Sequence, residues 1–564
     1  MPRINFGGMP FSMKRKLIWF ILCLWFVGPH LPVHAASAAH FSEMNDVRVV
    51  IDGKTVTFAQ PPIQIEGRMM LPLRGIFEHL GAKVTWSPDT QTVVATKGVQ
   101  EVVLWVNRNI ATVNYRPVIM EIPATIIHNS VMVPLRFVSE ALGAKVNWDQ
   151  RTRTVYISSG EIGDRCSPDW YDKSLTEVPI GKIVVEKTSQ PVYHNGYLDL
   201  DPVPDMVLAP GTERKVYEKI RIDGNNFYRI GTNLFVKASD SVKFIPIPYD
   251  QRTCIEDAVL IHHMERIVNG AAKQKSDVTK LMYVYTELMD LVQYDFDTRN
   301  GLSNNDLSYT WRGALAYGLA VCEGYSEALK LLLDKIGIES IIVRSLPMDH
   351  VWNMVKIDGK WYHVDATWED TNKSTLYYSL KYFLLSDEGI IKQQHHSWES
   401  NVKATSNQFA GYGSNRSTYH FDFENGRLYY RSNGLWSDSL DLRDPVRLTP
   451  EKYSIRDVQY AEDAIYFSTL NEGLFRVTYD GKLELLHEGR IWKFLVYDNK
   501  LYFMVNEGFT DRNTAVYVSD LDGSNVKLVN RFVDYRTLTG FYKNSDIDGV
   551  IFYYSDGIQY HIKS

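Results

Sequence analysis

The clearest hydrophobic periodicity lies in the middle of the chain. One apolar stripe at helical spacing consists of Val278, Leu281, Met282, Tyr285, Leu288, Met289 and Val292. A second helical pattern begins near Cys322 and ends at Gly337. Apolar residues three and four positions apart share one face of a helix, so both segments predict amphipathic helices that pack into a core.

Two strand-like runs follow the second helix, at residues 351–357 and 361–367. The dipeptide Asp358-Gly359 lies between them, and Asp-Gly between two such runs is a strong signal for a tight hairpin turn. We therefore expect these residues to form two antiparallel strands next to the second helix.

The hairpin register predicts which side chains meet. If the turn has two residues, Ile357 pairs with Lys360, and counting back places Trp352 opposite Asp365. His350 lies two residues before Trp352 and so points to the same face of the sheet. His350 and Asp365 are therefore expected to be diagonal cross-strand neighbours, within reach of each other's side chains.

A repeat dominates the N-terminal region. The sequence "MLPLRGIFEHLGAKVTWSPDTQTV" begins at Met70, and "MVPLRFVSEALGAKVNWDQRTRTV" begins at Met132. Each copy predicts a turn led by proline, a short amphipathic helix ended by glycine, and two strands. Repeated units of this kind bury a face against one another, so we expect one domain across residues 45–158.

Short strands broken by turn residues characterise two further regions. Residues 178–248 form one, and residues 416–564, with "GRLYY", "DAIYF", "NKLYF" and "GVIFYY", form the other. Aromatic residues make up 13% of the chain and suit pleated surfaces. A chain of 564 residues is too long for one core. We expect a multi-domain protein with α+β stalk repeats, a small β module, an α+β core at residues 254–395 and a C-terminal all-β domain.

The N-terminus predicts export. Lys14, Arg15 and Lys16 precede an apolar run at residues 17–27 and then small residues, which is the pattern of a signal peptide at residues 1–35. The run is too short to span a bilayer comfortably, so no integral membrane span is expected after cleavage. We expect a secreted, extracellular or cell-wall-associated protein. A net charge of -6 and the lack of a basic block in the mature chain argue against nucleic acid as a partner.

Export leaves three cysteines. Cys166 and Cys254 either pair or both stay unpaired, and in both cases Cys322 is left over. A thiol nucleophile acts as the thiolate, which a helix N-terminus favours. It also needs a histidine to take the proton and a carboxylate to hold the imidazole in one tautomer. Cys322, His350 and Asp365 can supply these three groups.

This segment resembles the transglutaminase-like superfamily of papain-like thiol enzymes. The resemblance rests on "AVCEGYSEALKLLLDKIGIES" and "DHVWNMVKIDGKWYHVDATWED" and covers about residues 254–395. It implies that Cys322 is the nucleophile, His350 the general base and acid, and Asp365 the orienting carboxylate. It also implies a papain-like α+β fold for this part of the chain.

Three further resemblances concern the flanking regions. Residues 45–158 resemble the copper amine oxidase N-terminal-like stalk domain of bacterial envelope proteins through the motif "PLR…LGA.V.W". They lack a cluster of His, Cys and Asp ligands, so copper chemistry is not expected there. Residues 178–248 resemble small SH3-like bacterial wall modules, which implies binding to wall polymers or peptides. Residues 416–564 resemble the blade repeats of β-propellers.

Other residues compete for roles in the site. His363 is the main rival base, because it lies two residues from Asp365 on the same predicted face, but the family pattern favours His350 and leaves His363 a structural group. Cys254 is a weaker rival nucleophile, since no carboxylate-bearing strand follows it at useful spacing. His395-His396 offers too few ligands for zinc, and no cofactor or metal is expected.

These features predict a secreted thiol enzyme that acts on protein or peptide amides by acyl transfer or hydrolysis. The backbone N–H of Cys322 is expected to contribute to an oxyanion hole, and Tyr309, Trp311 and Trp352 are candidates for substrate or oxyanion contacts. Two alternatives stay open. One is a catalytically inactive scaffold that binds cell-wall polymers or glycans, and the other is a thiol peptidase.

Overall fold

The computed structural model describes the chain from residue 41 to residue 562. Short gaps in the described part lie at residues 115, 161–165, 167–169, 171–174, 176, 196–199, 223, 232–233, 302–304, 373–377, 414–415, 462, 470, 507–512, 534–537, 544–549 and 555–558. The signal peptide expected at residues 1–35 lies outside the described residues. The chain divides into two compact units, one up to residue 160 and one from residue 161 onward, apart from residues 98–100, which group with the second.

In its described residues, the first unit contains two short helices and three sheets. The sheets have the strand orders β1-β4-β5-β12-β11, β10-β9-β8-β7-β6 and β13-β14-β2-β3. The elements are β1 (Phe41–Glu43), β2 (Arg48–Ile51), β3 (Lys54–Val56), β4 (Ile63–Ile65), β5 (Arg68–Pro72), α2 (Leu73–His79), β6 (Lys83–Ser87), β7 (Thr92–Lys97), β8 (Gln100–Trp105), β9 (Ile110–Val113), β10 (Arg116–Ile119), β11 (Thr125–Ile127), β12 (Ser130–Pro134), α3 (Leu135–Leu142), β13 (Lys145–Asp149) and β14 (Thr154–Ser158).

The two sequence repeats fold alike within this unit. β5 and β12 pair antiparallel, and each ends in the proline that begins a helix, Pro72 for α2 and Pro134 for α3. Each proline is the last strand residue before its helix, and its fixed φ suits the non-helical conformation found there, with ψ of 112° and 140°. Gly143 ends α3 at a φ of 72°, in the left-handed region that favours glycine. The expected order of helix, strand and strand is therefore found in both copies.

The second unit opens with two small antiparallel sheets. Their strand orders are β18-β15-β22 and β17-β16-β21-β20-β19. The strands are β15 (Gly181–Val185), β16 (Gln190–Asn195), β17 (Leu200–Leu208), β18 (Glu213–Val216), β19 (Glu218–Ile222), β20 (Asn225–Gly231), β21 (Leu234–Lys237) and β22 (Val242–Pro246). A small apolar core that includes Ile183, Val192 and Val236 lies between them.

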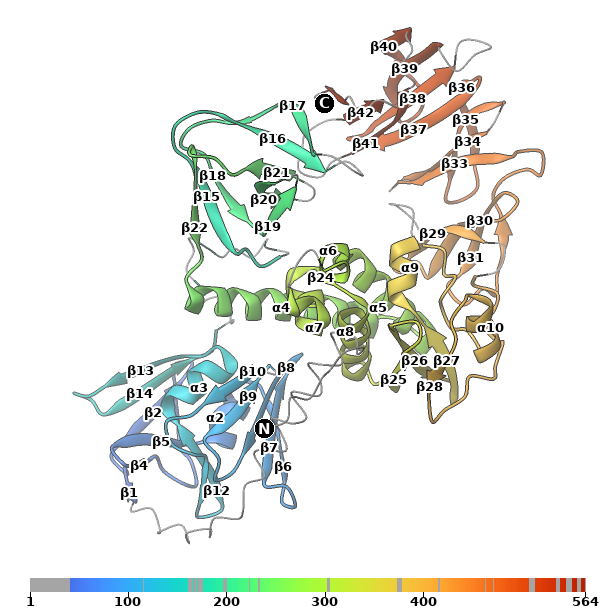
Figure 1. Cartoon of the computed structure of the whole chain (residues 1–564). Coiled ribbons are helices and arrows are strands. Elements are labelled where there is room, and N and C mark those ends of the chain that lie inside the picture. Colours follow the sequence, from blue (N-terminus) through green and yellow to red (C-terminus); the bar gives the residue numbers. More distant parts are fainter. Residues whose placement is uncertain are drawn as a thin grey trace, which may run out of the picture. The chain divides into compact units, whose positions relative to one another are not determined.

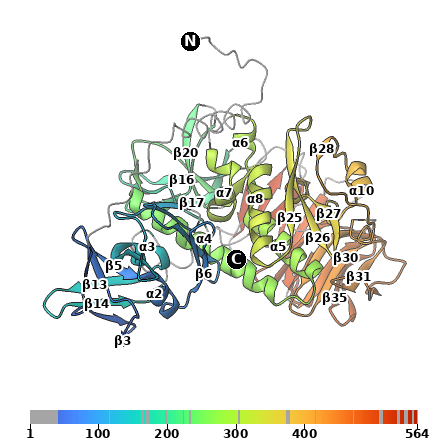
Figure 2. The same cartoon turned by 90° about the horizontal axis from the view of Figure 1, so that it is seen from below.

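Next along the chain, a layer of helices packs on one sheet. This region contains the largest apolar core of the described residues. Helix α8 packs against β25 and β26 of the sheet β27-β26-β25-β28 (Figures 1 and 2), and it also contacts α4, α5 and α7. The elements are α4 (Tyr249–Ala272), α5 (Asp277–Leu291), β23 (Gln293–Tyr294), α6 (Phe296–Arg299), η2 (Asp306–Tyr309), α7 (Trp311–Tyr317), β24 (Leu319–Ala320), α8 (Cys322–Lys335), β25 (Ser340–Ser345), β26 (His350–Ile357), β27 (Lys360–Val364), α9 (Ala366–Asn372), α10 (Asp387–Lys392) and β28 (Trp398–Glu399).

The expected pairing of the hairpin strands is confirmed, but the second strand ends earlier than expected. Ile357 pairs with Lys360, as the Asp-Gly turn predicts. The strand expected at residues 361–367 ends at Val364, and a helix begins at Ala366. Asp365 caps this helix, which is why the extended conformation stops there. The two expected helices are also found, as α5 and α8.

The C-terminal part consists of successive antiparallel sheets in which consecutive strands pair. Their orders are β29-β30-β31-β32, β33-β34-β35-β36, β37-β38-β39-β40 and β41-β42-β43. The strands are β29 (Ser417–Asp422), β30 (Arg427–Arg431), β31 (Leu435–Ser439), β32 (Val446–Arg447), β33 (Ile455–Tyr460), β34 (Ala464–Thr469), β35 (Gly473–Thr478), β36 (Leu483–Glu488), β37 (Ile491–Tyr497), β38 (Lys500–Asn506), β39 (Asn513–Asp520), β40 (Lys527–Val533), β41 (Leu538–Lys543), β42 (Val550–Tyr554) and β43 (Gln559–Ile562).

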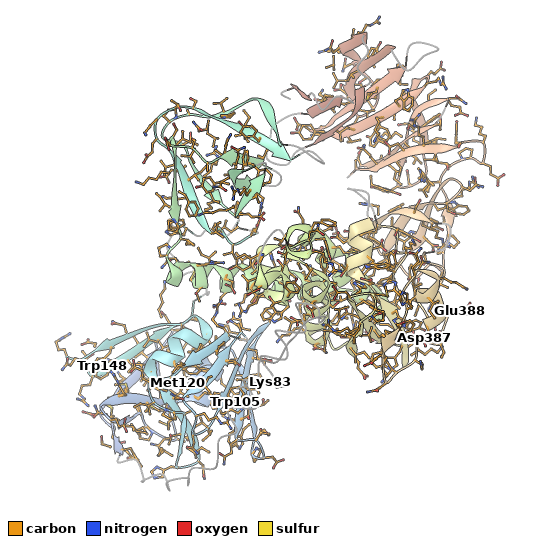
Figure 3. The ribbon with its side chains drawn as sticks, viewed as in Figure 1. Lys83, Trp105, Met120, Trp148, Asp387 and Glu388 are labelled. Carbon is orange, nitrogen blue, oxygen red and sulfur yellow. A yellow bond between two sulfur atoms is a disulfide. The ribbon has the colours of Figure 1, made fainter. Side chains whose placement is uncertain are left out.

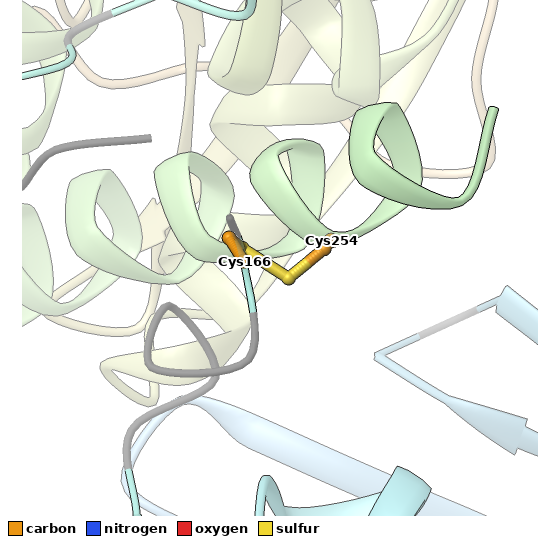
Figure 4. The surroundings of a disulfide bond; sticks show 2 residues. All are labelled: Cys166 and Cys254. Carbon is orange, nitrogen blue, oxygen red and sulfur yellow. A yellow bond between two sulfur atoms is a disulfide. The ribbon is translucent and has the colours of Figure 1, made fainter. Parts of the chain in front are cut away.

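One disulfide links the segment before the small sheets to α4. Cys166 bonds Cys254 across 88 residues of sequence (Figure 4), which decides between the two alternatives that the sequence left open. Cys254 is therefore excluded as a nucleophile, and Cys322 is the free cysteine of the described residues. Separately, none of the helices in the described part of the chain has the length and apolar composition to cross a bilayer.

Candidate active site

Cys322 is the first residue of α8, and the chain leading to it is firmly held. Val321, the residue before the helix, donates its N–H to the carbonyl of Ser308 at 2.9 Å. Gly324 is required in the first turn, because a Cβ there would lie only 2.6 Å from the same carbonyl oxygen. The first N–H groups of a helix have no intrahelical acceptor and favour a negative charge. Cys322 is 7% exposed, so its sulfur lies just inside the surface.

Strand β26 brings His350 to this helix end. Asn353 donates from Nδ2 to the carbonyl of Ser326 at 3.0 Å, and Ser326 donates from Oγ to the carbonyl of Val351 at 3.1 Å. These bonds connect β26 to the early turns of α8. Cys322 consequently lies near enough to the His350 imidazole to help raise the pKa of that imidazole.

Asp365 lies between the end of β27 and the start of α9, and it is almost fully buried. Its Oδ2 accepts the Nε2–H of His350 at 2.7 Å, and its Oδ1 accepts the backbone N–H of Trp368 at 3.1 Å. Its own N–H donates to the carbonyl of Tyr382, and its carbonyl accepts the hydroxyl of Tyr285. Hydrogen bonds thereby fix both oxygens of the carboxylate and the backbone of Asp365.

The electrostatics favour a protonated imidazole on an ionised carboxylate. Burial lowers the pKa of His350, but the charge and hydrogen bond of Asp365 and the contact with Cys322 outweigh it and raise the pKa to about 10. Burial raises the pKa of Asp365, but the two imidazoles of His350 and His395 outweigh it and hold the pKa below its usual range. Because Nε2 of His350 donates to Asp365, Nδ1 is the nitrogen left for the sulfur.

His395 is a member of the site that the sequence interpretation missed. Its Nε2 lies 2.8 Å from Oδ2 of Asp365, the oxygen that His350 also contacts. His395 follows Asp365 by 30 residues and is fully buried, between exposed neighbours. In the sequence, His395 is marked only by its neighbour His396. A pair of histidines suggests metal binding, and nothing in it indicates a contact with Asp365.

His363 is excluded as the rival base. It accepts the indole N–H of Trp352 at Nδ1, at 2.9 Å, and donates from Nε2 to Asp387 at 2.9 Å. Asp387 is labelled in Figure 3, at the start of α10. Burial lowers the pKa of His363 to about 4, against the opposing effect of Asp387, so the ring is neutral. The two histidines that contact Asp365 are therefore His350 and His395, and His363 contacts Asp387 instead.

Trp352 has a packing role and not an oxyanion role. It is fully buried, its ring stacks on that of His350 with centroids 5.6 Å apart, and its N–H is already donated to His363. A donor that is already used inside the core is not available to a substrate. The prediction that Trp352 contacts the substrate or the oxyanion is therefore wrong.

Three other aromatic residues lie on elements next to the thiol. Tyr309 is half-buried, and burial and then nearby negative groups, including Cys322, raise its pKa. Tyr294, which sequence reasoning missed, shows the same pattern, with Cys322 the second cause after burial. Trp311 begins α7, and its ring faces the Arg312 guanidinium at 4.8 Å. Tyr294 and Tyr309 are thus close enough to Cys322 for its charge to raise their pKa values.

The site also presents a group with metal-ligand chemistry. The nearest donor atoms of His350, Asp365 and His395 all lie within 4.8 Å of one another. Ligands at about 2.0 Å from a tetrahedral zinc ion are roughly 3.3 Å apart. The separations of 2.7 and 2.8 Å at Oδ2 are instead those of hydrogen bonds to a carboxylate. The distances between these atoms therefore indicate hydrogen bonds between the two imidazoles and the carboxylate.

The charge on His350 predicts a pH-dependent stability. A pKa raised from 6.5 to about 10 means that the stabilisation is complete below pH 6.5 and is lost as the pH rises through about 10. The unfolding free energy of the wild type should therefore exceed that of His350→Gln at pH 6, and the difference should shrink towards pH 10.5. The exposed His396, changed to Gln, is the control, and a difference that is constant with pH would contradict the prediction.

Comparisons with known families give three matches of limited length. Residues 50–157 match the copper amine oxidase N-terminal domain, residues 203–239 the surface layer protein A domain, and residues 265–366 the transglutaminase-like superfamily. No curated protein matches the chain in sequence. The C-terminal sheets and His395 lie outside these three matches.

Similar solved structures are remote. A TGase shares 16% identity with a TM-score of 0.19, over 27% of this chain and 45% of its own. A protein from Cytophaga hutchinsonii proposed to be a cysteine protease shares 12% with a TM-score of 0.16, over 33% and 74%. A protein from Agrobacterium tumefaciens proposed to be TolB shares 13% with a TM-score of 0.19, over 34% and 89%. The chain thus spans less than half the length of that TGase.

Two of the three family matches lie within segments whose sequences already resemble the same families, residues 45–158 and residues 254–395. The chain contains a copper amine oxidase N-terminal domain at residues 50–157 and a transglutaminase-like core at residues 265–366.

Proposed function

We propose that the protein is a secreted thiol enzyme that performs acyl transfer or hydrolysis on protein or peptide amides at the bacterial cell surface. The observation that carries the proposal is the buried hydrogen bond between Asp365 and His350, together with the placement of β26 next to Cys322 at the start of α8. A buried carboxylate, an oriented imidazole and a sulfur at a helix N-terminus are the parts that nucleophilic thiol catalysis needs. The transglutaminase-like match agrees with a thiol enzyme.

The proposed reaction begins from the ion pair in which the proton of the Cys322 sulfur has already passed to His350. The thiolate attacks the amide carbonyl carbon, and a C–S bond forms as the carbonyl oxygen becomes an oxyanion. Collapse breaks the C–N bond, and His350 gives its proton to the departing nitrogen, which leaves as ammonia or an amine. A second amine, or water, then attacks the thioester while His350 takes its proton, and the sulfur leaves.

The oxyanion needs hydrogen-bond donors at the first turn of α8. As the first helical residue, Cys322 has a backbone N–H without an intrahelical acceptor. Tyr309 and Trp311 stay candidates for the second donor, and Tyr294 joins them because its ring lies in the electrostatic range of the sulfur. Asp365 does not take part in proton transfer and keeps His350 in the tautomer that faces the sulfur.

The flanking regions support a place in the cell envelope. We propose that residues 178–248 are an SH3-like module, that residues 416–564 are propeller-like, and that both bind cell-wall polymers or present substrates. The surface layer protein A match at residues 203–239 favours this reading. It also favours the second candidate function, a catalytically inactive scaffold that binds wall polymers or glycans.

The decisive experiment traps the thioester. The protein is incubated with a biotin-labelled alkyl amine and a bacterial envelope extract, and mass spectrometry identifies the carbonyl groups that receive the amine. Wild type should label amide side chains or cleaved peptide ends, and Cys322→Ala should label none. Isopeptide products indicate transfer, and new C-termini indicate a thiol peptidase. Equal labelling and equal binding to the extract in both forms would favour the scaffold.

A further inference from the structure

The carboxylate of the proposed triad carries a second imidazole. Oδ2 of Asp365 lies 2.7 Å from Nε2 of His350 and 2.8 Å from Nε2 of His395, and none of the His395 or Asp365 side chain is exposed. A carboxylate whose protons are lost can only accept hydrogen bonds, so both imidazoles donate to the same oxygen. His395 is outside the transglutaminase-like match at residues 265–366.

The fold holds His395 in place with unusual backbone. Gln394 has a φ of 68° and Ser397 a φ of 56°, a left-handed conformation that is unfavourable for residues other than glycine. The N–H of His395 donates to the carbonyl of Ile390 at 3.2 Å, which closes the turn after α10. β28 then pairs with β25 and forms the edge of the sheet. Such conformations persist where the surrounding structure fixes them, and they cluster at functional sites.

Aromatic rings enclose the imidazole. Trp368 lies 4.2 Å from the ring of His395 by centroid distance, and Trp352 packs edge to face at 4.9 Å. The remaining ring nitrogen, Nδ1, lies 3.2 Å from the carbonyl of Gln393. The ring therefore has fixed neighbours on its faces and a hydrogen-bond acceptor at each nitrogen, so its N–H vector to Asp365 cannot turn away.

Other polar groups around the carboxylate are engaged elsewhere. Tyr285 of α5 donates to the backbone carbonyl of Asp365 and not to its carboxylate. Glu369 of α9 accepts from the backbone N–H groups of residues 379, 380 and 382. Tyr382 lies close enough for the charge of Asp365 to raise its pKa, after burial. Cys322 of α8 acts on His350, and His395 acts directly on Oδ2.

We propose that His395 is a positioning residue, which fixes the Asp365 carboxylate and limits how strongly that carboxylate holds the proton on His350. Two donors that share one oxygen divide its negative charge, so each is bound less tightly than it would be alone. The imidazolium then releases its proton to the leaving group more readily. The inference rests on the proposed function, because it gives His395 a part in the same proton transfers.

The test uses the thiol and needs no substrate. Cys322 is alkylated with iodoacetamide from pH 6 to 11, and peptide mass spectrometry follows the Cys322 peptide. The upper inflection of the rate against pH reports the loss of the imidazolium proton from His350. His395→Phe keeps a ring but removes the donor. His395→Gln keeps an N–H donor at the position of Nε2, and it also guards against a variant that fails to fold.

We expect the upper inflection to move up by about one pH unit in His395→Phe, a tenfold change in the protonation equilibrium, and to stay in place in His395→Gln. His363→Phe is the matched control, since His363 is equally buried but bonds Asp387. An unmoved inflection in His395→Phe, or an equal shift in His363→Phe, overturns the inference. Loss of Cys322-dependent labelling in the amine experiment would overturn the proposed function, and it is measured separately.

Discussion

Replacement of Asp365 with asparagine is expected to lower the rate of amine transfer by about 10⁴-fold, with little change in the fold. The substitution keeps the size of the side chain and an oxygen that can cap α9 through the N–H of Trp368. It removes the charge that holds the imidazolium form of His350. The amide has only one oxygen, so when that oxygen caps α9 the amide N–H₂ group takes the place of Oδ2 and faces His350 and His395.

The expected loss has a tautomeric cause. With an asparagine N–H directed at its Nε2, His350 would carry its proton on Nδ1, the nitrogen that faces Cys322. An imidazole protonated there cannot take the proton of the thiol. The measurement is the initial rate of transfer of the biotin-labelled amine, together with the unfolding transition of the same variant.

The matched control for this prediction is Asp387→Asn. Asp387 also accepts from a buried imidazole, that of His363 at 2.9 Å, but it is not joined to the thiol. Its replacement should leave the transfer rate within about tenfold of the wild type. Should Asp365→Asn retain a rate in that range, the carboxylate would be a helix cap and not a catalytic positioning group.

The sequence predicted the parts of the site that depend on local structure. The Asp358-Gly359 turn fixes the pairing of Ile357 with Lys360, and a period of two residues then places His350 on the face of Asp365. The apolar spacing that follows Cys322 predicts α8 with the thiol at its start. Such features need only neighbours in the chain, which is why they were accessible without coordinates.

The features that the sequence did not predict depend on distant contacts. His395 reaches Asp365 because Gln394 and Ser397 adopt left-handed conformations and a strand of two residues, β28, pairs with β25. A strand this short has no measurable periodicity. The extended run expected up to residue 367 was interrupted because Asp365 caps a helix, which its strand-like surroundings did not reveal.

Truncation of Trp352 to alanine is expected to lower the unfolding free energy of the catalytic region by about 3–5 kcal/mol. The side chain is fully buried, stacks on His350, and meets the ring of Trp398 edge to face at 5.9 Å. Alanine would leave a cavity behind the catalytic imidazole. It would also leave Nδ1 of His363 without the indole N–H that it accepts, which adds to the cost.

The chain has several compact parts, so the measurement must report on this one. Alkylation of Cys322 in increasing urea does so, because the thiol is nearly buried until the surrounding core opens. Trp352→Phe should lose only part of the stability, since it fills much of the cavity but lacks the N–H. Trp361→Ala, on the neighbouring strand and half-exposed, is the control with a smaller expected loss. A midpoint for Trp352→Ala equal to that of Trp361→Ala would show that the core does not depend on the ring behind His350.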